Sequence, residues 1–241
     1  MSKDRPAIPD PMQRALRQEA YLGCVFCGNP IIEYHHIVQY HIVKCHEQSN
    51  LVVLCTDHHH RANCGEIIKK RVIEAKNNPY NKNIDFVGKE IFFQEYDKVK
   101  IRAGNTVFEN FSNFGDSSIL IQIENKTLLS ISKDDKGYAL INAEFYDKNN
   151  NLVASIKNSE WKAYKGAKLW DIEYSPGHLI IRSQSGIRFL EFRLIGGYIE
   201  LKVDMHYNNK CVSFKPKGLS VGNMKFTDCK FESNGINIRI N

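Results

Sequence analysis

The sequence predicts an α+β protein in which a small N-terminal module, residues 1–83, is followed by an all-β domain, residues 84–241. Two observations support this prediction. Cysteine and histidine are crowded near the start of the chain, since five of the seven cysteines and seven of the nine histidines precede residue 65. The hydrophobic pattern also changes after the polar segment 76–83, from mixed helical and short apolar runs to runs that alternate with the period of a strand.

The composition is that of a globular protein, with 42% hydrophobic and 25% charged residues. No apolar run approaches the ~18 to 20 residues that a membrane helix needs. The first residues lack an apolar stretch followed by a small-residue cleavage site, so we expect a cytoplasmic protein. The net charge of +6 favours approach to a polyanion without identifying one.

The N-terminal module is expected to contain two helical segments and two short strands. Residues 12–22 place apolar side chains near one helical face. Residues 31–38 and 50–55 are rich in β-branched and apolar residues, as short strands are. Residues 57–76 have a narrow apolar helical face that Gly65 can interrupt, and Pro79 ends the module.

The remaining chain has the alternating pattern of strands separated by turn residues. The predicted strands cover residues 118–123, 127–132, 139–146, 152–157, 178–183, 187–194 and 198–205. The last residues, 218–241, have a cadence that resembles the rungs of a solenoid. The sequence therefore leaves the β domain open between a sandwich and a short solenoid.

Four residues have the spacing of a structural zinc site. Cys24 and Cys27 form one pair and Cys55 and His58 a second, each with two residues between its members. Thiolate and imidazole are the donors that Zn²⁺ prefers, and a reducing cytoplasm disfavours disulfides. This predicts a tetrahedral Cys3His site, and the alternative is a set of reduced thiols without metal.

The segments around these ligands resemble the HNH endonuclease family. The matching segments are CVFC, EYHHI, SNLVVLC and TDHHHRA, in the order and approximate spacing of the family's zinc-knuckle version, within residues 12–76. The resemblance implies a ββα-metal fold that places a histidine pair, an asparagine and a further histidine along a hairpin and a helix. In this chain those positions are His35 and His36, Asn50, and His59.

The resemblance also implies a role for each position. His36 corresponds to the general base, and an imidazole with a pKa near ~6.5 can take a proton from water at neutral pH. His35 and His59, with Asn63 as a further ligand, would hold Mg²⁺ or another divalent ion that neutralises charge on the scissile phosphate. Asn50 would hydrogen-bond across the hairpin and hold the loop that bears His36.

These roles predict a metal-dependent endonuclease with DNA as the expected substrate, RNA left open, and a β domain for targeting, assembly or regulation. The triplet at residues 58–60 leaves a shifted register open, in which His59 joins the zinc site and His60 faces the catalytic ion. The alternative function is a non-catalytic zinc knuckle that binds nucleic acid. The candidate phosphate contacts are Arg14, Arg17, Arg61, Lys69, Lys70 and Arg71.

Overall fold

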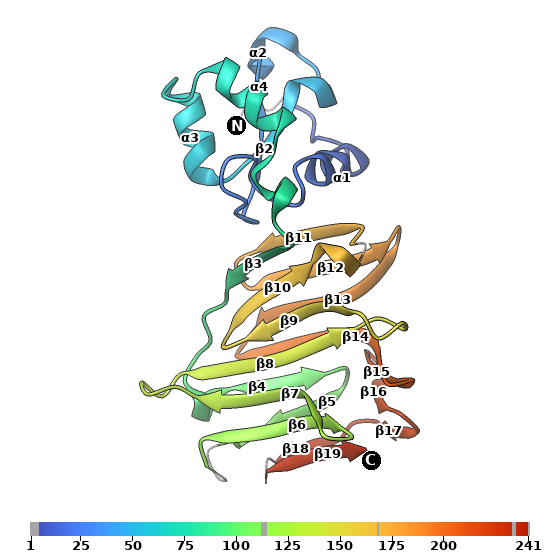
Figure 1. The fold of residues 1–241 in the computed structure, drawn as a ribbon. Coiled ribbons are helices and arrows are strands. Elements are labelled where there is room, and N and C mark those ends of the chain that lie inside the picture. Colours follow the sequence, from blue (N-terminus) through green and yellow to red (C-terminus); the bar gives the residue numbers. More distant parts are fainter. Residues whose placement is uncertain (1–4, 112–114, 168, 233–234, 241) are drawn as a thin grey trace. The chain divides into compact units, whose positions relative to one another are not determined.

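The chain divides into two compact units (Figure 1). Unit 1 consists of Met1–Val87 together with Trp170–Ser175. Unit 2 consists of Gly88–Leu169 together with Pro176–Asn241. The computed structural model describes residues 5–111, 115–167, 169–232 and 235–240.

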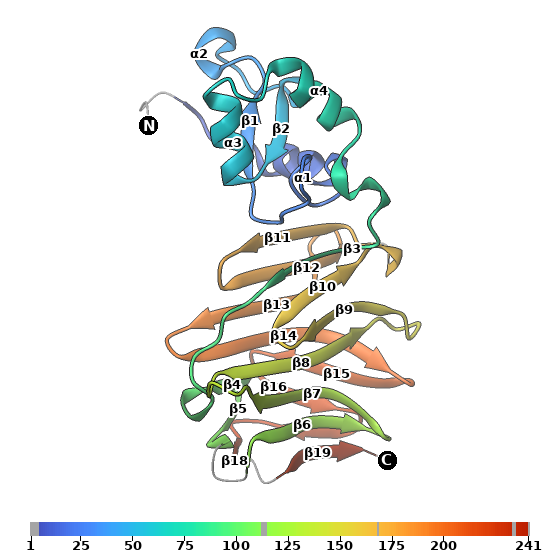
Figure 2. The ribbon, with the colours of Figure 1, turned by 60° about the vertical axis from the view of Figure 1, so that its left-hand side comes forward.

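Unit 1 is built around a two-stranded antiparallel hairpin that is packed against helices (Figure 2). Its elements are α1 (Asp10–Glu19), β1 (Glu33–His36), α2 (Tyr40–Val43), β2 (Leu51–Leu54), α3 (Thr56–Asn63), α4 (Lys69–Asn77) and β11 (Asp171–Ser175), with 3-10 turns at Gln48–Asn50 and Tyr80–Asn83. All four residues of β2 are buried, because α1, α3 and α4 contact it. Leu16 and Val72 complete this core from α1 and α4.

The helices of unit 1 are short. Residues 57–76, expected to be helical with a break at Gly65, form α3 and α4, and Gly65 lies between them with a φ of +80°. Glycine adopts this left-handed conformation without the steric penalty of a side chain, which is why the helix ends there. None of the helices in the described residues has the length and apolar character that crossing a membrane requires.

Unit 2 contains two large sheets, visible in Figures 1 and 2 as two layers of strands. The first has the order β19-β6-β7-β8-β9-β10-β3. Its strands are β3 (Phe86–Glu90), β6 (Ser117–Ile123), β7 (Lys126–Lys133), β8 (Ala139–Tyr146), β9 (Leu152–Lys157), β10 (Glu160–Tyr164) and β19 (Ile236–Ile240). From β6 to β10 each strand pairs antiparallel with the next, which is the order that short turns produce.

In the second sheet β12-β13-β14-β15-β16-β17 succeed one another as antiparallel neighbours. These strands are β12 (His178–Gln184), β13 (Ile187–Ile195), β14 (Tyr198–Tyr207), β15 (Lys210–Lys215), β16 (Gly218–Val221) and β17 (Met224–Phe226). The sheet also includes β4 (Lys100–Ala103), parallel to β14, β5 (Thr106–Glu109) and β18 (Lys230–Glu232). Antiparallel hairpins dominate both sheets, whereas the rungs of a solenoid would pair in parallel.

The predicted α+β class is wrong. Strands make up 47% of the described residues and helices 20%, and large sheets extend across most of this part of the chain. The predicted ββα-metal module is not a distinct body either, because unit 1 adds further helices to its hairpin and includes the distant segment Trp170–Ser175. Local patterns suggested a self-contained module, but the contact between α1 and β11 depends on residues far apart in the sequence.

Candidate metal centre

Four donor atoms converge where a tight turn meets the start of α3. The turn at Cys24–Gly28 is closed by a hydrogen bond from the amide of Gly28 to the carbonyl of Cys24 at 2.8 Å. The strand β2 ends immediately before Cys55, and the first turn of α3 carries His58. The donor atoms of Cys24, Cys27, Cys55 and His58 all lie within 4.8 Å of one another. This group could hold a metal ion such as zinc.

Two of the distances within the group are close to those of tetrahedral coordination, whereas His58 lies nearer to Cys55 than a shared ion would hold it. The sulfur of Cys27 lies 3.7 Å from that of Cys55, and Nδ1 of His58 lies 3.1 Å from Cys55 Sγ and 3.7 Å from Cys24 Sγ. Zinc bonds of about 2.3 Å to sulfur and about 2.0 Å to nitrogen, at tetrahedral angles, separate the donors by about 3.5 to 3.8 Å. The nitrogen donor of this group is His58 and not His59. This agrees with the predicted Cys24, Cys27, Cys55 and His58 set and not with the shifted register.

The two thiols of the first pair are electrostatically unequal. A hydrogen bond from Cys24 is the main reason that the pKa of Cys27 falls to about 5. The backbone amide of Asn29 and the ring of His58 lower it further. Thiolate is the form that binds metal, so the turn favours the ligating state of Cys27.

A residue that the sequence did not identify closes this turn from outside. Asn81 is buried, and its side-chain Nδ2 donates to the carbonyl of Gly28 at 3.3 Å and to that of Tyr21 at 3.2 Å. A Cβ atom at Gly28 would lie 2.2 Å from Oδ1 of Asn81, and Gly28 has a φ of +73°. Both facts explain why glycine follows Cys27.

His35 and His59 face each other beside the metal centre. His35 on β1 is 8% exposed, and its ring centroid lies 5.2 Å from that of His59 on α3 at an interplanar angle of 80°. Burial, with His59 and His36 nearby, lowers the pKa of His35 to about 4. The Nδ1 atom of His59 contacts the carboxylate of Glu33.

Glu33 was missed at the sequence level, although one signal points to it. Residues i and i+2 of a strand lie on the same face, so Glu33 and His35 are expected on one side of β1. A carboxylate that holds one nitrogen of a histidine fixes the ring and its tautomer, which is a common feature of metal-ligating histidines. Glu33 therefore contacts His59 as a carboxylate contacts a metal-ligating histidine whose ring it holds in place.

Hydrogen bonds determine the tautomer of His36. Arginine only donates, so the bond of 3.0 Å between Arg5 Nη2 and His36 Nδ1 makes Nδ1 an acceptor. The proton then lies on Nε2, which donates to Nδ1 of His46 at 3.1 Å, and His46 donates to the carbonyl of Pro6 at 2.8 Å. Burial, Arg5 and His46 lower the pKa of His36 to about 4.

The two predicted asparagines differ in their surroundings. Asn50 lies at the start of β2, accepts a hydrogen bond from the amide of Val38 at 2.7 Å and donates to the carbonyl of Val38 at 2.9 Å. It thus holds the backbone that follows His36. Asn63 is exposed at the end of α3, and within the described part of the chain no hydrogen bond joins it to His35 or His59.

The predicted phosphate contacts also fall into two groups. Arg17 is buried and donates to both carboxylate oxygens of Asp171, so it is not available to a phosphate. Arg14 lies over the ring of Trp170 at 4.2 Å, and Arg61 is exposed but bonded to Glu66. The remaining candidates are exposed on α4: Lys69, Lys70 and Arg71.

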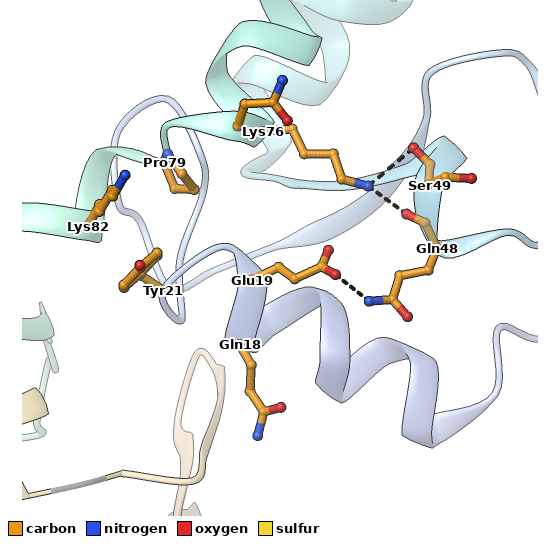
Figure 3. Close-up of a pocket in the computed structure, with 9 residues that line it drawn as sticks. Gln18, Glu19, Tyr21, Gln48, Ser49, Lys76, Pro79 and Lys82 are labelled. Atoms are coloured by element: carbon orange, nitrogen blue, oxygen red, sulfur yellow. Dashed lines mark hydrogen bonds between the residues drawn. The ribbon is translucent and has the colours of Figure 1, made fainter.

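A hollow of about 640 Å³ in unit 1 lies among α1, α4 and the turn at Gln48–Asn50 (Figure 3). Lys76 donates to the carbonyls of Gln48 at 2.5 Å, Ser49 at 3.2 Å and Leu51 at 2.7 Å. Its ammonium group is therefore fully engaged in holding the turn, and the hollow contains no cysteine or histidine. It has no part in the chemistry of the metal centre.

Comparison with protein-family models, with curated proteins and with solved structures finds no match to this chain. What can be inferred about function therefore depends on the residues and their geometry.

Proposed function

We propose that unit 1 is a metal-dependent nuclease of the HNH type, which hydrolyses phosphodiester bonds in nucleic acid. The observation that supports this most directly is the pair His35 and His59, whose rings lie edge to face with centroids 5.2 Å apart while Glu33 holds the second ring. A structural metal site needs no imidazole beyond its own ligands. The proposal depends on these residues and does not require a separate ββα-metal module.

We propose zinc as the ion of the four-residue centre. Three cysteines and one histidine form a soft donor set that zinc fills with four protein ligands, which leaves no position for substrate. The centre would therefore hold together the turn at Cys24–Gly28, the end of β2 and the start of α3. Its role in the reaction is to fix the positions of His35 and His59.

His35 and His59 would bind a second, catalytic divalent ion. The lowered pKa of His35 keeps its ring neutral near pH 7, and neutral imidazole is the form that binds a metal. Glu33 would keep Nε2 of His59 directed away from the carboxylate. A bound divalent ion would supply charge neutralisation at the phosphate and at the oxygen that leaves.

His36 would act as the general base. The oxygen of water bonds to phosphorus while the bond from phosphorus to the leaving oxygen breaks, and the proton of water passes to Nδ1 of His36. The leaving oxygen takes a proton from solvent. Because Arg5 occupies Nδ1, it must move before the reaction, and a phosphate is the natural acceptor for its guanidinium.

The test compares plasmid cleavage by the wild-type chain and by His36→Ala in Mg²⁺, Mn²⁺ or Ni²⁺. Loss of a general base is expected to slow cleavage by about 10² to 10⁴. His41→Ala is the matched control, because His41 is exposed on the neighbouring helix α2 and has no role in the mechanism. Equal rates for wild type and His36→Ala would remove the catalytic assignment.

Glu33→Gln provides a more specific reading. The amide retains the size of the side chain but loses the charge that holds His59, so the concentration of Mn²⁺ needed for half-maximal rate should rise about 10- to 100-fold. The rate at saturating Mn²⁺ should change less. If both the wild-type chain and the His36→Ala variant bind nucleic acid but neither cleaves it, a zinc knuckle that only binds nucleic acid would be favoured instead.

A further inference from the structure

The second sheet of unit 2 has an outward face that carries many charged side chains. Along β14 the buried residues Leu201 and Val203 alternate with Glu200 and Lys202, so every second side chain points away from the core. The pairing registers place outward residues of β4, β13 and β15 beside those of β14. The outward side chains of these strands therefore form one continuous surface.

Glu191 on β13 lies at the centre of the first charged cluster. Its carboxylate contacts Arg188 Nη1 at 2.8 Å, Arg193 Nε at 2.8 Å and Lys202 Nζ at 3.5 Å, and His178 Nε2 at 3.3 Å. The side chain of Glu191 is only 1% exposed, whereas those of the three cations are between 38% and 55% exposed. One negative charge is thus surrounded by three positive charges that remain accessible.

A second cluster on β5 also has a buried acid at its centre. The carboxylate of Glu109 contacts Lys100 Nζ at 3.1 Å and is also bonded to Lys230. Glu109 is buried, and both lysines are more than two-fifths exposed. Glu232, exposed on β18 opposite Glu109, is a second acid beside Lys230.

An aromatic ring lies between these clusters. The guanidinium of Arg102 is 4.1 Å from the ring centroid of Tyr198, and Nζ of Lys100 is 5.8 Å from it. Tyr198 is half-buried on β14. The ring therefore holds two cations over the surface and adds a planar apolar group to it.

We name this surface the basic face. Its cations are Lys100, Arg102, Arg188, Arg193, Lys202, Lys215 and Lys230, and its acids are Glu109, Glu191, Glu200, Asp204 and Glu232. Seven positive charges thus face five negative ones. The first sheet carries cations as well: Lys126 pairs with Glu144, Lys133 with Asp116 and Lys162 with Glu160, and its strands also hold Lys157 and Arg239.

We propose that the basic face binds the phosphate backbone of a nucleic acid. Three accessible cations gathered around the buried Glu191, with Arg102 and Lys100 over Tyr198, give this face a local positive charge that attracts a polyanion. Arginine forks suit phosphate oxygens, and a ring such as Tyr198 can contact a base. The inference rests on the proposed nuclease function only in choosing nucleic acid over another polyanion.

The test uses the full chain carrying His36→Ala, so that cleavage does not interfere, and measures binding to labelled single-stranded and duplex DNA over a range of salt. One variant carries Arg188→Gln, Lys215→Gln and Lys230→Gln. Its control carries Lys126→Gln, Lys133→Gln and Lys162→Gln, which removes the same charge from the first sheet. Each lost phosphate contact should lower the slope of log affinity against log salt by about 0.7 to 0.9, and affinity at low salt should fall about tenfold or more. The control variant should keep both the salt dependence and the affinity of the His36→Ala chain.

A second measurement needs no substitution on the face. Acetylation of lysines in the His36→Ala chain, with and without DNA, should show protection of Lys100, Lys202, Lys215 and Lys230 and none of Lys126, Lys133 and Lys162. Three results would overturn the inference. DNA could protect the lysines of both sheets equally, or the two triple variants could lose DNA affinity equally. The chain could also bind phosphatidylserine vesicles as strongly as it binds DNA. If the basic face binds DNA as expected but the wild-type chain never cleaves it, the proposed nuclease function would be wrong and this inference would remain.

Discussion

The two units of this chain are stabilised in different ways. Unit 1 has a hairpin of two four-residue strands, and only a small set of buried apolar side chains surrounds it. Unit 2 has strands of up to ten residues, and its core contains large apolar side chains such as Phe192 and Phe214, which are at most 2% exposed. Small cores seldom suffice on their own, so metals or disulfides often supplement them.

The difference shows why the chemistry gathers in unit 1. Its buried polar groups are many for its size, and they include His35, His36, Arg17 and Asn81. Each such group lowers stability unless it is hydrogen-bonded or paired. A metal ion held by the four residues of the candidate centre would fix three chain segments at once, which would allow a small unit to retain these polar groups. Unit 2 instead keeps its charges on the outward faces of well-packed sheets.

The largest expected effect therefore follows from removing the metal. Cys24→Ser should abolish binding of about one zinc ion per chain and unfold unit 1, because structural zinc can contribute on the order of 10 kcal/mol to folding. Unit 2 should stay folded. Metal analysis and amide hydrogen exchange would measure both results. Cys211→Ser, a change of a cysteine outside the centre, is the control. If Cys24→Ser left exchange in unit 1 unchanged, the metal centre would not hold it.

The next effect tests the charges inside unit 1. Asp171→Ala leaves the buried Arg17 without its closest partner, which should destabilise unit 1 by about 3 to 5 kcal/mol. Replacing both residues by apolar ones, Arg17→Met with Asp171→Leu, should restore most of the stability. Denaturant unfolding followed by hydrogen exchange in α1 would measure the changes. A double variant as unstable as the single one would show that packing, and not the ion pair, is responsible.

A comparable change in unit 2 acts through packing alone. Leu201→Ala removes a side chain that is 1% exposed on the core face of β14, and should cost about 2 to 5 kcal/mol. Calorimetry should show a lower transition for unit 2, while zinc content and exchange in unit 1 stay at wild-type values. If instead the variant lost zinc, the two units would not be independently stabilised.

The sequence predicted what depends on neighbouring residues. The four residues of the candidate metal centre were found because their spacing is local to a turn and a helix start, and strands such as β8 and β14 because their alternation is long. Short strands such as β17, with three residues, carry too little pattern to recognise. Their pairing depends on neighbours supplied by the tertiary fold.

The sequence could not predict which side chains pair when they are distant along the chain. Arg17 looked like a phosphate contact because the sequence does not show that Asp171, 154 positions later, would bind it. In the same way Arg5 and His46 determine the state of His36, although neither belongs to the pattern around it. Patterns identify residue types at a site, but the tertiary structure determines which of them are already engaged.

The smallest expected effect is on the stability of unit 2 at low pH, through the buried carboxylate of Glu191. Burial alone would raise the pKa of Glu191, but Lys202, Arg188 and Arg193 hold it below its ordinary value. The unfolded chain then binds a proton more readily than the folded one, so this stability is present above about pH 4.5 and is lost as the pH falls through the lowered pKa.

Glu191→Gln should therefore lower the transition temperature of unit 2 near pH 7 and have progressively less effect toward pH 3. Calorimetry of both proteins across this range would measure the difference. Glu160→Gln is the matched control, because its carboxylate is exposed and pairs with a single lysine, so its curve should follow that of wild type. Parallel curves for Glu191→Gln and wild type would mean that the cations of the basic face do not stabilise this carboxylate, and that their charge is directed entirely toward solvent.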